Sequence, residues 1–422
     1  MKRKHLILLA LVASASVLSP TPSGAQEGAL QDRTLRLNYI FSGDSRSASI
    51  SLSEAICMED GWWGRGVNLD GVPLRGNGLI TMTDELGGKV LYRNSFSTLF
   101  QEWQNSEEAT RSVKSFENVF LLPMPSAKVN VEVKLFDSHD RVTASLTHMV
   151  DPSDILIRRI ARTPTEHRYL HRSGDSHGKI DIAIVAEGYT KKEMKTFYKD
   201  AEAAMRSIWS HEPFSSMKDR FNIVAVAAPS RDSGVSVPRE GDWKDTALGS
   251  HFDTFYSDRY LTTLNLFTLH DVLSGIPYEH IIILANTSTY GGGGIYNSYV
   301  LTAAHHQYTS PVVVHEFGHS FAGLADEYYY DDQYEQFYNS EVEPWEPNIT
   351  TLVDGGAKWK DMVGKVEGVG YFEGAGYMTK GAWRPTEDCR MKTNTFPTFC
   401  PVCERAVRDI ILFNTEEMEP GK

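Results

Sequence analysis

The sequence predicts an all-β sandwich over residues 26–150, followed by an α/β (α+β) domain with a mixed sheet over residues 151–422. Two patterns and the chain length support this prediction. Residues 33–150 contain short alternating apolar and polar runs separated by Gly, Asp and Ser turns, as half-buried strands do. After residue 151, strand patterns alternate with helical ones, an order suited to a sheet backed by helices. A chain of 422 residues is also long enough for two domains.

The first 25 residues have the pattern of a secretory signal peptide. Residues 2–4 are basic, an apolar run extends from Leu6 to Leu18, and residues 23–25 are small, as a cleavage site requires. The apolar run is shorter than the roughly 20 residues of a membrane span. We therefore expect an exported protein, periplasmic or extracellular, with no membrane span.

Composition narrows the class of protein. With 41% hydrophobic and 11% aromatic residues and no low-complexity tract, the chain is expected to be globular. Its formal net charge of −13 makes nucleic acid a poor partner.

In the first domain, strands are expected over residues 35–40, 49–52 and 129–135. The pair Trp62-Trp63, flanked by glycines, has two interpretations. We favour aromatic residues that pack within the sandwich. The alternative is an exposed platform for a glycan or host glycoprotein.

In the second domain, buried strands are expected over residues 180–185, 221–227 and 281–284. Between the first two, residues 190–209 predict a helix capped by Thr190, with apolar residues on one face. This order predicts a mixed sheet with helices against it.

The segment His315-Glu316-Phe317-Gly318-His319 is an HExxH motif. On a helix, its two histidines lie one turn apart on the same face, so they can bind one zinc ion with bonds of about 2.0–2.1 Å. Glu316 lies beside that face and is placed to act as the general base on a water molecule. The alternative is a core helix whose histidines only form hydrogen bonds.

The residues after the motif offer candidates for a third metal ligand. Gly323 can end the helix in a left-handed conformation, which turns the chain back toward the metal and brings Asp326 within reach. Glu327 is a competing candidate for the third ligand, although we favour a role in which it supports the ligands without binding the metal. A distant glutamate, as in gluzincins, is a further alternative.

Metzincin zinc peptidases have the pattern HExxHxxGxxH, and here the glycine and the acid each come one residue later. This spacing and the continuation Leu324-Ala325-Asp326-Glu327-Tyr328 resemble the immunoglobulin A metallopeptidase-like family of secreted bacterial zinc peptidases. The resemblance implies a metzincin-like fold, one catalytic Zn²⁺ and Asp326 as the third ligand.

The resemblance extends to the segments on either side of the motif. The glycine-rich segment 290–300 is similar to a metzincin edge strand, which can align an extended peptide, although a flexible loop is equally compatible with its glycines. Met391 is similar to the methionine beneath the zinc in metzincins, and Met378 is the alternative. A tyrosine that assists the transition state would be Tyr371 or Tyr377. His305 and His306 are not expected to bind the metal.

Three of the four cysteines, Cys389, Cys400 and Cys403, lie near the C-terminus. We expect a disulfide from Cys389 to Cys400 or Cys403, because an exported protein commonly uses such residues structurally. A thioredoxin-type dithiol and a zinc knuckle are the alternatives, and the knuckle lacks an obvious fourth ligand in this region.

These observations predict an exported zinc-dependent endopeptidase that hydrolyses protein or peptide substrates. The alternative is a former peptidase that binds glycan or protein through its sandwich, although the intact Glu316 argues against it. The resemblance does not transfer the immunoglobulin substrate, because specificity depends on variable loops.

Overall fold

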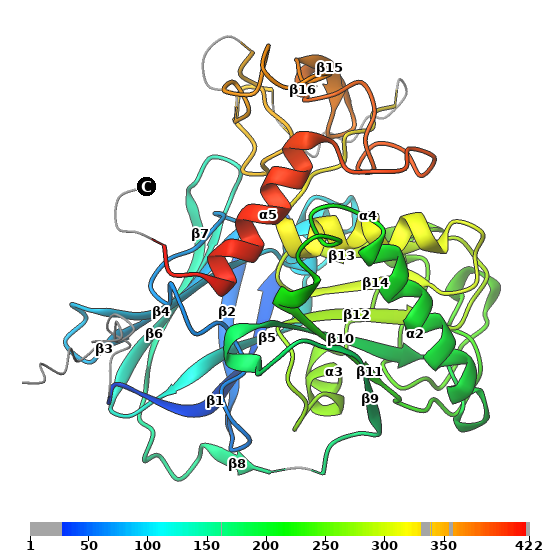
Figure 1. Cartoon of the computed structure of the whole chain (residues 1–422). Helices are drawn as coiled ribbons and strands as arrows, with labels where there is room; N and C mark the ends of the chain where they lie inside the picture. The colour runs from blue at the N-terminus through cyan, green and yellow to red at the C-terminus, as the bar shows by residue number, and fades with distance from the viewer. Residues whose placement is uncertain (1–27, 162, 331–337, 339, 354–357, 419–422) are drawn as a thin grey trace, which may run out of the picture.

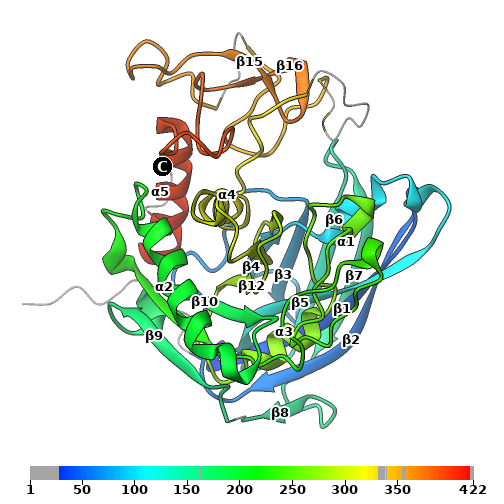
Figure 2. The same ribbon diagram turned by 90° about the vertical axis from the view of Figure 1, so that its right-hand side faces the viewer.

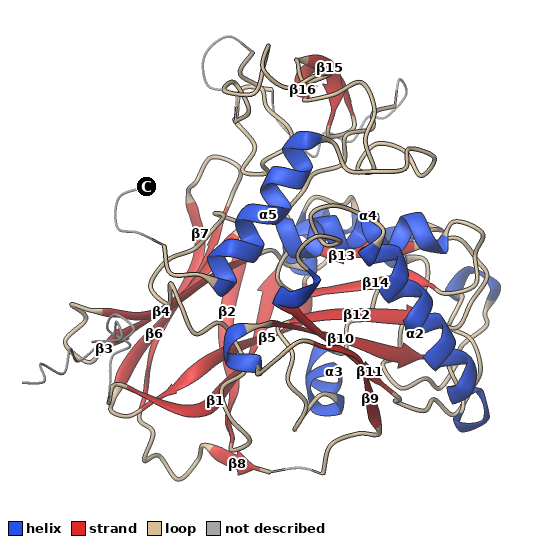
Figure 3. Cartoon of the chain, viewed as in Figure 1, coloured by secondary structure: helices blue, strands red, loops and turns tan. Residues whose placement is uncertain are grey.

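The computed structural model describes residues 28–161, 163–330, 338, 340–353 and 358–418 (Figure 1). The signal peptide predicted at residues 1–25 lies outside the described residues. Strands account for most of the described regular structure (Figure 3). Among the described residues, no helix is both long and apolar enough to cross a membrane.

Two four-stranded sheets form the N-terminal part of the chain, in the orders β5-β1-β2-β8 and β4-β3-β6-β7. The first sheet contains β1 (Leu30–Gly43), β2 (Ala48–Met58), β5 (Lys114–Pro125) and β8 (Arg158–Ile160). The second contains β3 (Gly78–Asp84), β4 (Val90–Phe96), β6 (Val129–Phe136) and β7 (Val142–Val150). Residues of both sheets share one hydrophobic core. Phe41 of β1 and Phe96 of β4, for example, have ring centroids 6.4 Å apart.

The first sheet extends past residue 150, where we expect the domain boundary. Strand β8 pairs in parallel with β2 through Ile56 and Arg158. The chain therefore leaves this sheet only after Ile160.

Trp62 packs inside the N-terminal part, as we expected. It is 8% exposed, its ring meets Tyr92 edge to face at 5.6 Å, and its Nε1 donates a hydrogen bond to the carbonyl of Arg65 at 3.1 Å. Because Trp62 is buried, Trp62 and Trp63 do not form the exposed platform that we considered for a glycan.

A six-stranded mixed sheet, in the order β13-β14-β12-β10-β11-β9, is the centre of the second part. Its strands are β9 (His167–Arg172), β10 (Ile180–Glu187), β11 (Phe221–Val226), β12 (His280–Ala285), β13 (Gly292–Ile295) and β14 (Tyr299–Ala303). Strands β11, β10, β12 and β14 run parallel, while β9 and β13 pair antiparallel at the two edges. The glycine-rich segment thus forms an edge strand, and the loop alternative is wrong.

Alternate residues of β10 face two different cores, as the period of a strand requires. Ile182 and Ile184 face the core that contains residues of α2 (Met194–Trp209), α4 (Thr309–Ala322) and α5 (Pro401–Thr415). Ala183 and Val185 face the core shared with the N-terminal sheets and α3 (Leu266–Val272). Figure 2 shows α2 and α5 on one side of α4 and the N-terminal strands on the other.

The helix expected over residues 190–209 is confirmed. A short 3₁₀ turn, Lys191–Glu193, precedes α2, and Thr190 forms a capping box with Glu193. After α4, the described chain forms a two-stranded sheet of β15 (Phe372–Ala375) and β16 (Met378–Arg384) before α5.

Candidate metal centre

Helix α4 carries His315 and His319 on one face. Their Nε2 atoms lie 3.0 Å apart, so the two rings point toward one place. The Nδ1 atom of His315 donates a hydrogen bond to the carbonyl of Arg390 at 3.0 Å, and that of His319 donates to the carbonyl of Leu324 at 2.5 Å. Because a carbonyl can only accept, these bonds place the ring proton on Nδ1. In the neutral form of each ring, Nε2 then presents a lone pair for a metal ion.

The turn at Gly323 brings Asp326 to the histidines. Gly323 has φ of 57°, the left-handed conformation that the sequence predicts for it, and it ends α4. The Oδ1 atom of Asp326 lies 2.9 Å from Nε2 of His315 and 3.3 Å from Nε2 of His319. Three ligand atoms from one short segment thus converge.

These distances fit a zinc ion. Tetrahedral zinc with bonds of about 2.0–2.1 Å holds its ligand atoms about 3.3–3.4 Å apart, close to the spacings of the His315, His319 and Asp326 atoms. The three residues form one of two groups in the described chain that could hold a metal ion. Glu327 belongs to the other group, so it does not compete with Asp326.

The charges of the three side chains depend on one another. Burial opposes the charge on His319, but Asp326 and Glu316 beside it raise the His319 pKa to about 9. Burial likewise opposes the charge on Asp326, yet the two histidines hold the pKa of this carboxyl well below its usual range. Asp326 is thus kept ionised, the form that binds a cation.

The side chain of Glu316 extends from α4 toward the edge strand β13. A Cβ atom at Gly292 would be 3.3 Å from Oε1 of Glu316, so the carboxylate reaches the strand. Burial raises the pKa of Glu316, although His315 and His319 oppose the shift. A carboxylate with a raised pKa is suited to accept and return a proton near neutral pH.

Strand β13 needs glycine because α4 approaches it so closely. A Cβ atom at Gly294 would lie 2.2 Å from the backbone oxygen of Glu316 and 3.1 Å from Cβ of His319. The first contact is with backbone, which cannot rotate away. The glycines of this segment therefore set the distance between the edge strand and the candidate metal ligands on α4.

We expect Gly294→Ala to destabilise the protein by about 1–3 kcal/mol, because the added methyl group forces α4 away from β13. Chemical unfolding would measure the effect. Gly88→Ala is the matched control, since a Cβ atom there meets nothing within 4 Å. Equal stability of Gly294→Ala and the control would show that the close approach is not needed.

A cleft of about 1530 Å³ is lined by His315, His319, Asp326 and Glu316. Its wall includes Glu102 from α1 (Leu99–Gln104), a helix of the N-terminal part. Burial raises the pKa of Glu102 to about 7, and the hydroxyl of Tyr260 donates a hydrogen bond to it. No motif marks Glu102 in the sequence, because only the packing of the two parts brings α1 to the cleft.

The structure places Met391 against α4 and distinguishes between the two candidate tyrosines. Met391 is fully buried, and its sulfur would be 2.8 Å from a Cβ atom at Gly318, so it packs directly against α4. Tyr377 donates a hydrogen bond to Oδ2 of Asp326, whereas Tyr371 packs against Trp359 at 6.0 Å. Met391 and Tyr377 are therefore the residues next to the candidate site.

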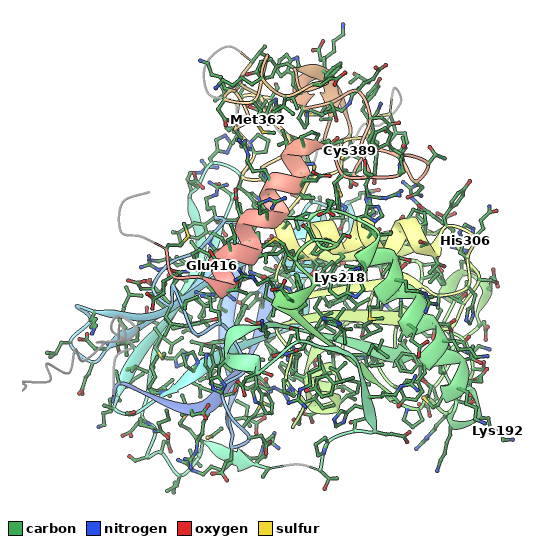
Figure 4. The ribbon with its side chains drawn as sticks, in the orientation of Figure 1. Lys192, Lys218, His306, Met362, Cys389 and Glu416 are labelled. Carbon is green, nitrogen blue, oxygen red and sulfur yellow. The ribbon has the colours of Figure 1, made fainter. Side chains whose placement is uncertain are left out.

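The two histidines before α4 are outside the site, as expected. His305 contacts Asp200 through Nε2 at 2.8 Å, and the ring of His306 packs against Tyr290 at 5.1 Å. Figure 4 shows His306 near the start of α4.

The predicted disulfide from Cys389 to Cys400 or Cys403 is wrong. All four cysteines are free and buried. The sulfur atoms of Cys389 and Cys403 lie 3.8 Å apart, whereas a disulfide bond is about 2.05 Å long.

The cleft combines an edge strand with a helix that carries HExxH. This arrangement suits a peptidase, because peptidases bind their substrates as extended strands. The chain belongs to the family described as IgA Peptidase M64, whose pattern matches residues 169–368 and 364–411. Residues 27–147 match the family described as Peptidase M64 N-terminus. These matches confirm the resemblance seen in the sequence, and they make the protein a peptidase that acts on protein or peptide substrates. No curated protein matches the chain.

Proposed function

We propose that this protein is an exported, zinc-dependent endopeptidase with a metzincin-like active site. The observation that carries the proposal is the convergence of His315, His319 and Asp326, whose ligand atoms lie 2.9–3.3 Å apart beside Glu316. Two imidazoles and a carboxylate form a common donor set for catalytic zinc, in which a fourth position is open to water or substrate. Export is proposed from the signal-peptide pattern of residues 1–25.

The chain's own residues have distinct roles in this proposal. When bound, zinc supplies a Lewis acid that polarises the scissile carbonyl and acidifies a water molecule. Glu316 takes the proton of the attacking water and passes it to the leaving amine. Tyr377 positions Asp326 through its hydrogen bond to Oδ2.

Strand β13 provides the place where a peptide would align. Gly293 and Gly294 line the cleft. On either side of them, Gly292 donates a hydrogen bond to the carbonyl of Arg259 at 3.4 Å, and Ser97 donates to the carbonyl of Tyr296 at 3.0 Å. An extended substrate would therefore pair with a short stretch of strand, directly beside Glu316.

The test is digestion of a complex peptide library, with cut sites identified by mass spectrometry. We expect cleavage by the zinc-loaded protein, loss of cleavage after chelation, and recovery on adding Zn²⁺. Cleavage that continues unchanged without metal would contradict a metal-dependent mechanism. Absence of cleavage by zinc-loaded protein would favour a former peptidase that only binds its partners.

A further inference from the structure

Cys389, Cys400, Cys403 and Glu327 form a cluster beside the candidate active site. One potential ligand atom from each lies within 4.8 Å of all the others. The sulfur atoms of Cys389 and Cys403 are 3.8 Å apart, and the Cys403 sulfur is 3.3 Å from Oε1 of Glu327. Tetrahedral zinc with Zn–S bonds of about 2.3 Å would place its sulfur ligands about 3.8 Å apart.

The cluster is buried, and its carboxylate lacks enough protein partners. Glu327 is 0% exposed, and the three cysteines are at most 2% exposed. Oε1 of Glu327 accepts a hydrogen bond from Asn348 at 2.9 Å, whereas its Oε2 has no hydrogen-bond partner among the described residues. If this buried carboxylate is ionised beside the three sulfur atoms, a cation is needed to balance its charge.

The backbone around the cluster is arranged to stabilise thiolates. The amide of Cys400 donates a hydrogen bond to the Cys389 sulfur at 3.2 Å, and the amide of Met391 donates to the same atom at 3.5 Å. The amide of Cys403 donates to the Cys400 sulfur at 3.5 Å. Cys400 also caps the N-terminus of α5, where the helix dipole favours negative charge. Such N–H donors commonly surround metal-bound sulfur.

We propose that these four residues bind a second, structural zinc ion. Binding would release the protons of the thiols and convert them to thiolates. With four protein ligands the site is closed, as structural zinc sites are. The proposal does not depend on the peptidase activity, because its ligands are separate from His315, His319 and Asp326.

The second ion would hold the catalytic ligands in place from two sides. Glu327 directly follows Asp326, and its amide donates a hydrogen bond to the carbonyl of Met391 at 2.9 Å. Cys389 directly precedes Arg390, whose carbonyl accepts the hydrogen bond from Nδ1 of His315. An ion bound by Glu327 and Cys389 would thus tie both segments to the first turn of α5, beside which Figure 4 places Cys389.

Metal analysis of the full chain, purified with Zn²⁺, would test the proposal. We expect about two zinc ions per chain in the wild type and about one in Cys403→Ser. Cys57→Ser is the matched control and should keep both ions, because Cys57 is buried elsewhere, in β2. His315→Ala should also keep one ion, so each site is counted separately. Equal zinc content in Cys403→Ser and the wild type would overturn the proposal.

Two measurements on the wild-type protein avoid any effect of the variants on folding. Loading with Co²⁺ should produce thiolate-to-cobalt charge-transfer absorption, which the histidine and aspartate ligands cannot produce. Titration with a mercurial thiol reagent should release one zinc ion per chain. A disulfide between two of the three cysteines in the zinc-loaded protein, or cobalt binding without thiolate absorption, would overturn the proposal. If the protein showed thiolate absorption but cleaved no peptide, the proposed peptidase function would be refuted and the proposed structural zinc site would stand.

Discussion

Replacing Glu316 with glutamine is expected to lower the rate of peptide hydrolysis by about 10²–10⁴-fold, the usual contribution of a general base. Glutamine has nearly the same shape, but it cannot take a proton from the attacking water. The zinc content should not change, because Glu316 is beside the ligand group and not part of it. Steady-state hydrolysis of a cleaved peptide, with metal analysis of the same sample, would measure both effects.

A control variant distinguishes the loss of the general base from the loss of one negative charge. Glu240→Gln removes one negative charge at an exposed position outside the cleft and should leave hydrolysis unchanged. If Glu316→Gln retained wild-type activity, Glu316 would not be the general base.

Replacing Asp326 with alanine is expected to weaken binding of the catalytic zinc by more than 100-fold. Loss of a residue that only supports a ligand already costs about 10–100-fold in metal affinity, and Asp326 is itself a proposed ligand. Activity should fall with metal occupancy. Competition with a chromophoric chelator would measure the affinity, and the cysteine cluster should still hold its own ion.

Because Tyr377 donates a hydrogen bond to Asp326, a variant at Tyr377 should have a zinc affinity between those of the wild type and Asp326→Ala. Tyr377→Phe removes this bond together with the hydroxyl's hydrogen bond to Tyr328, so its zinc affinity should fall by about 10–100-fold. Tyr371→Phe, at the tyrosine that packs against Trp359, should behave like the wild type. Wild-type zinc affinity in Asp326→Ala would remove Asp326 from the ligand set.

Much of the fold could be predicted because local patterns determine it. The strands expected at residues 180–185 and 281–284 lie within β10 and β12, and the helix from Thr190 agrees with α2. These segments have strong periodicity and clear caps, which tertiary contacts do not override. Strand β8 was not predicted, because three residues with little burial carry almost no pattern.

The cysteines show where sequence reasoning failed. The predicted export of the chain suggested a disulfide, and no fourth ligand was apparent near Cys400 and Cys403. Glu327 lies 62 residues before Cys389 in the numbering, so no local pattern connects them. Only the folded chain places its carboxylate beside the three sulfur atoms.

By itself, the sequence determined the part of the site that one helical turn and one glycine bend can specify: His315, Glu316, His319 and the return of the chain to Asp326. Helix geometry and the conformational freedom of Gly323 act over a few residues, so they can be read locally. Tertiary structure alone decided which distant groups surround that segment. Glu102 reaches the cleft from the N-terminal part, Tyr377 binds Asp326, and the cysteines meet Glu327, because packing between elements far apart in the chain sets these contacts.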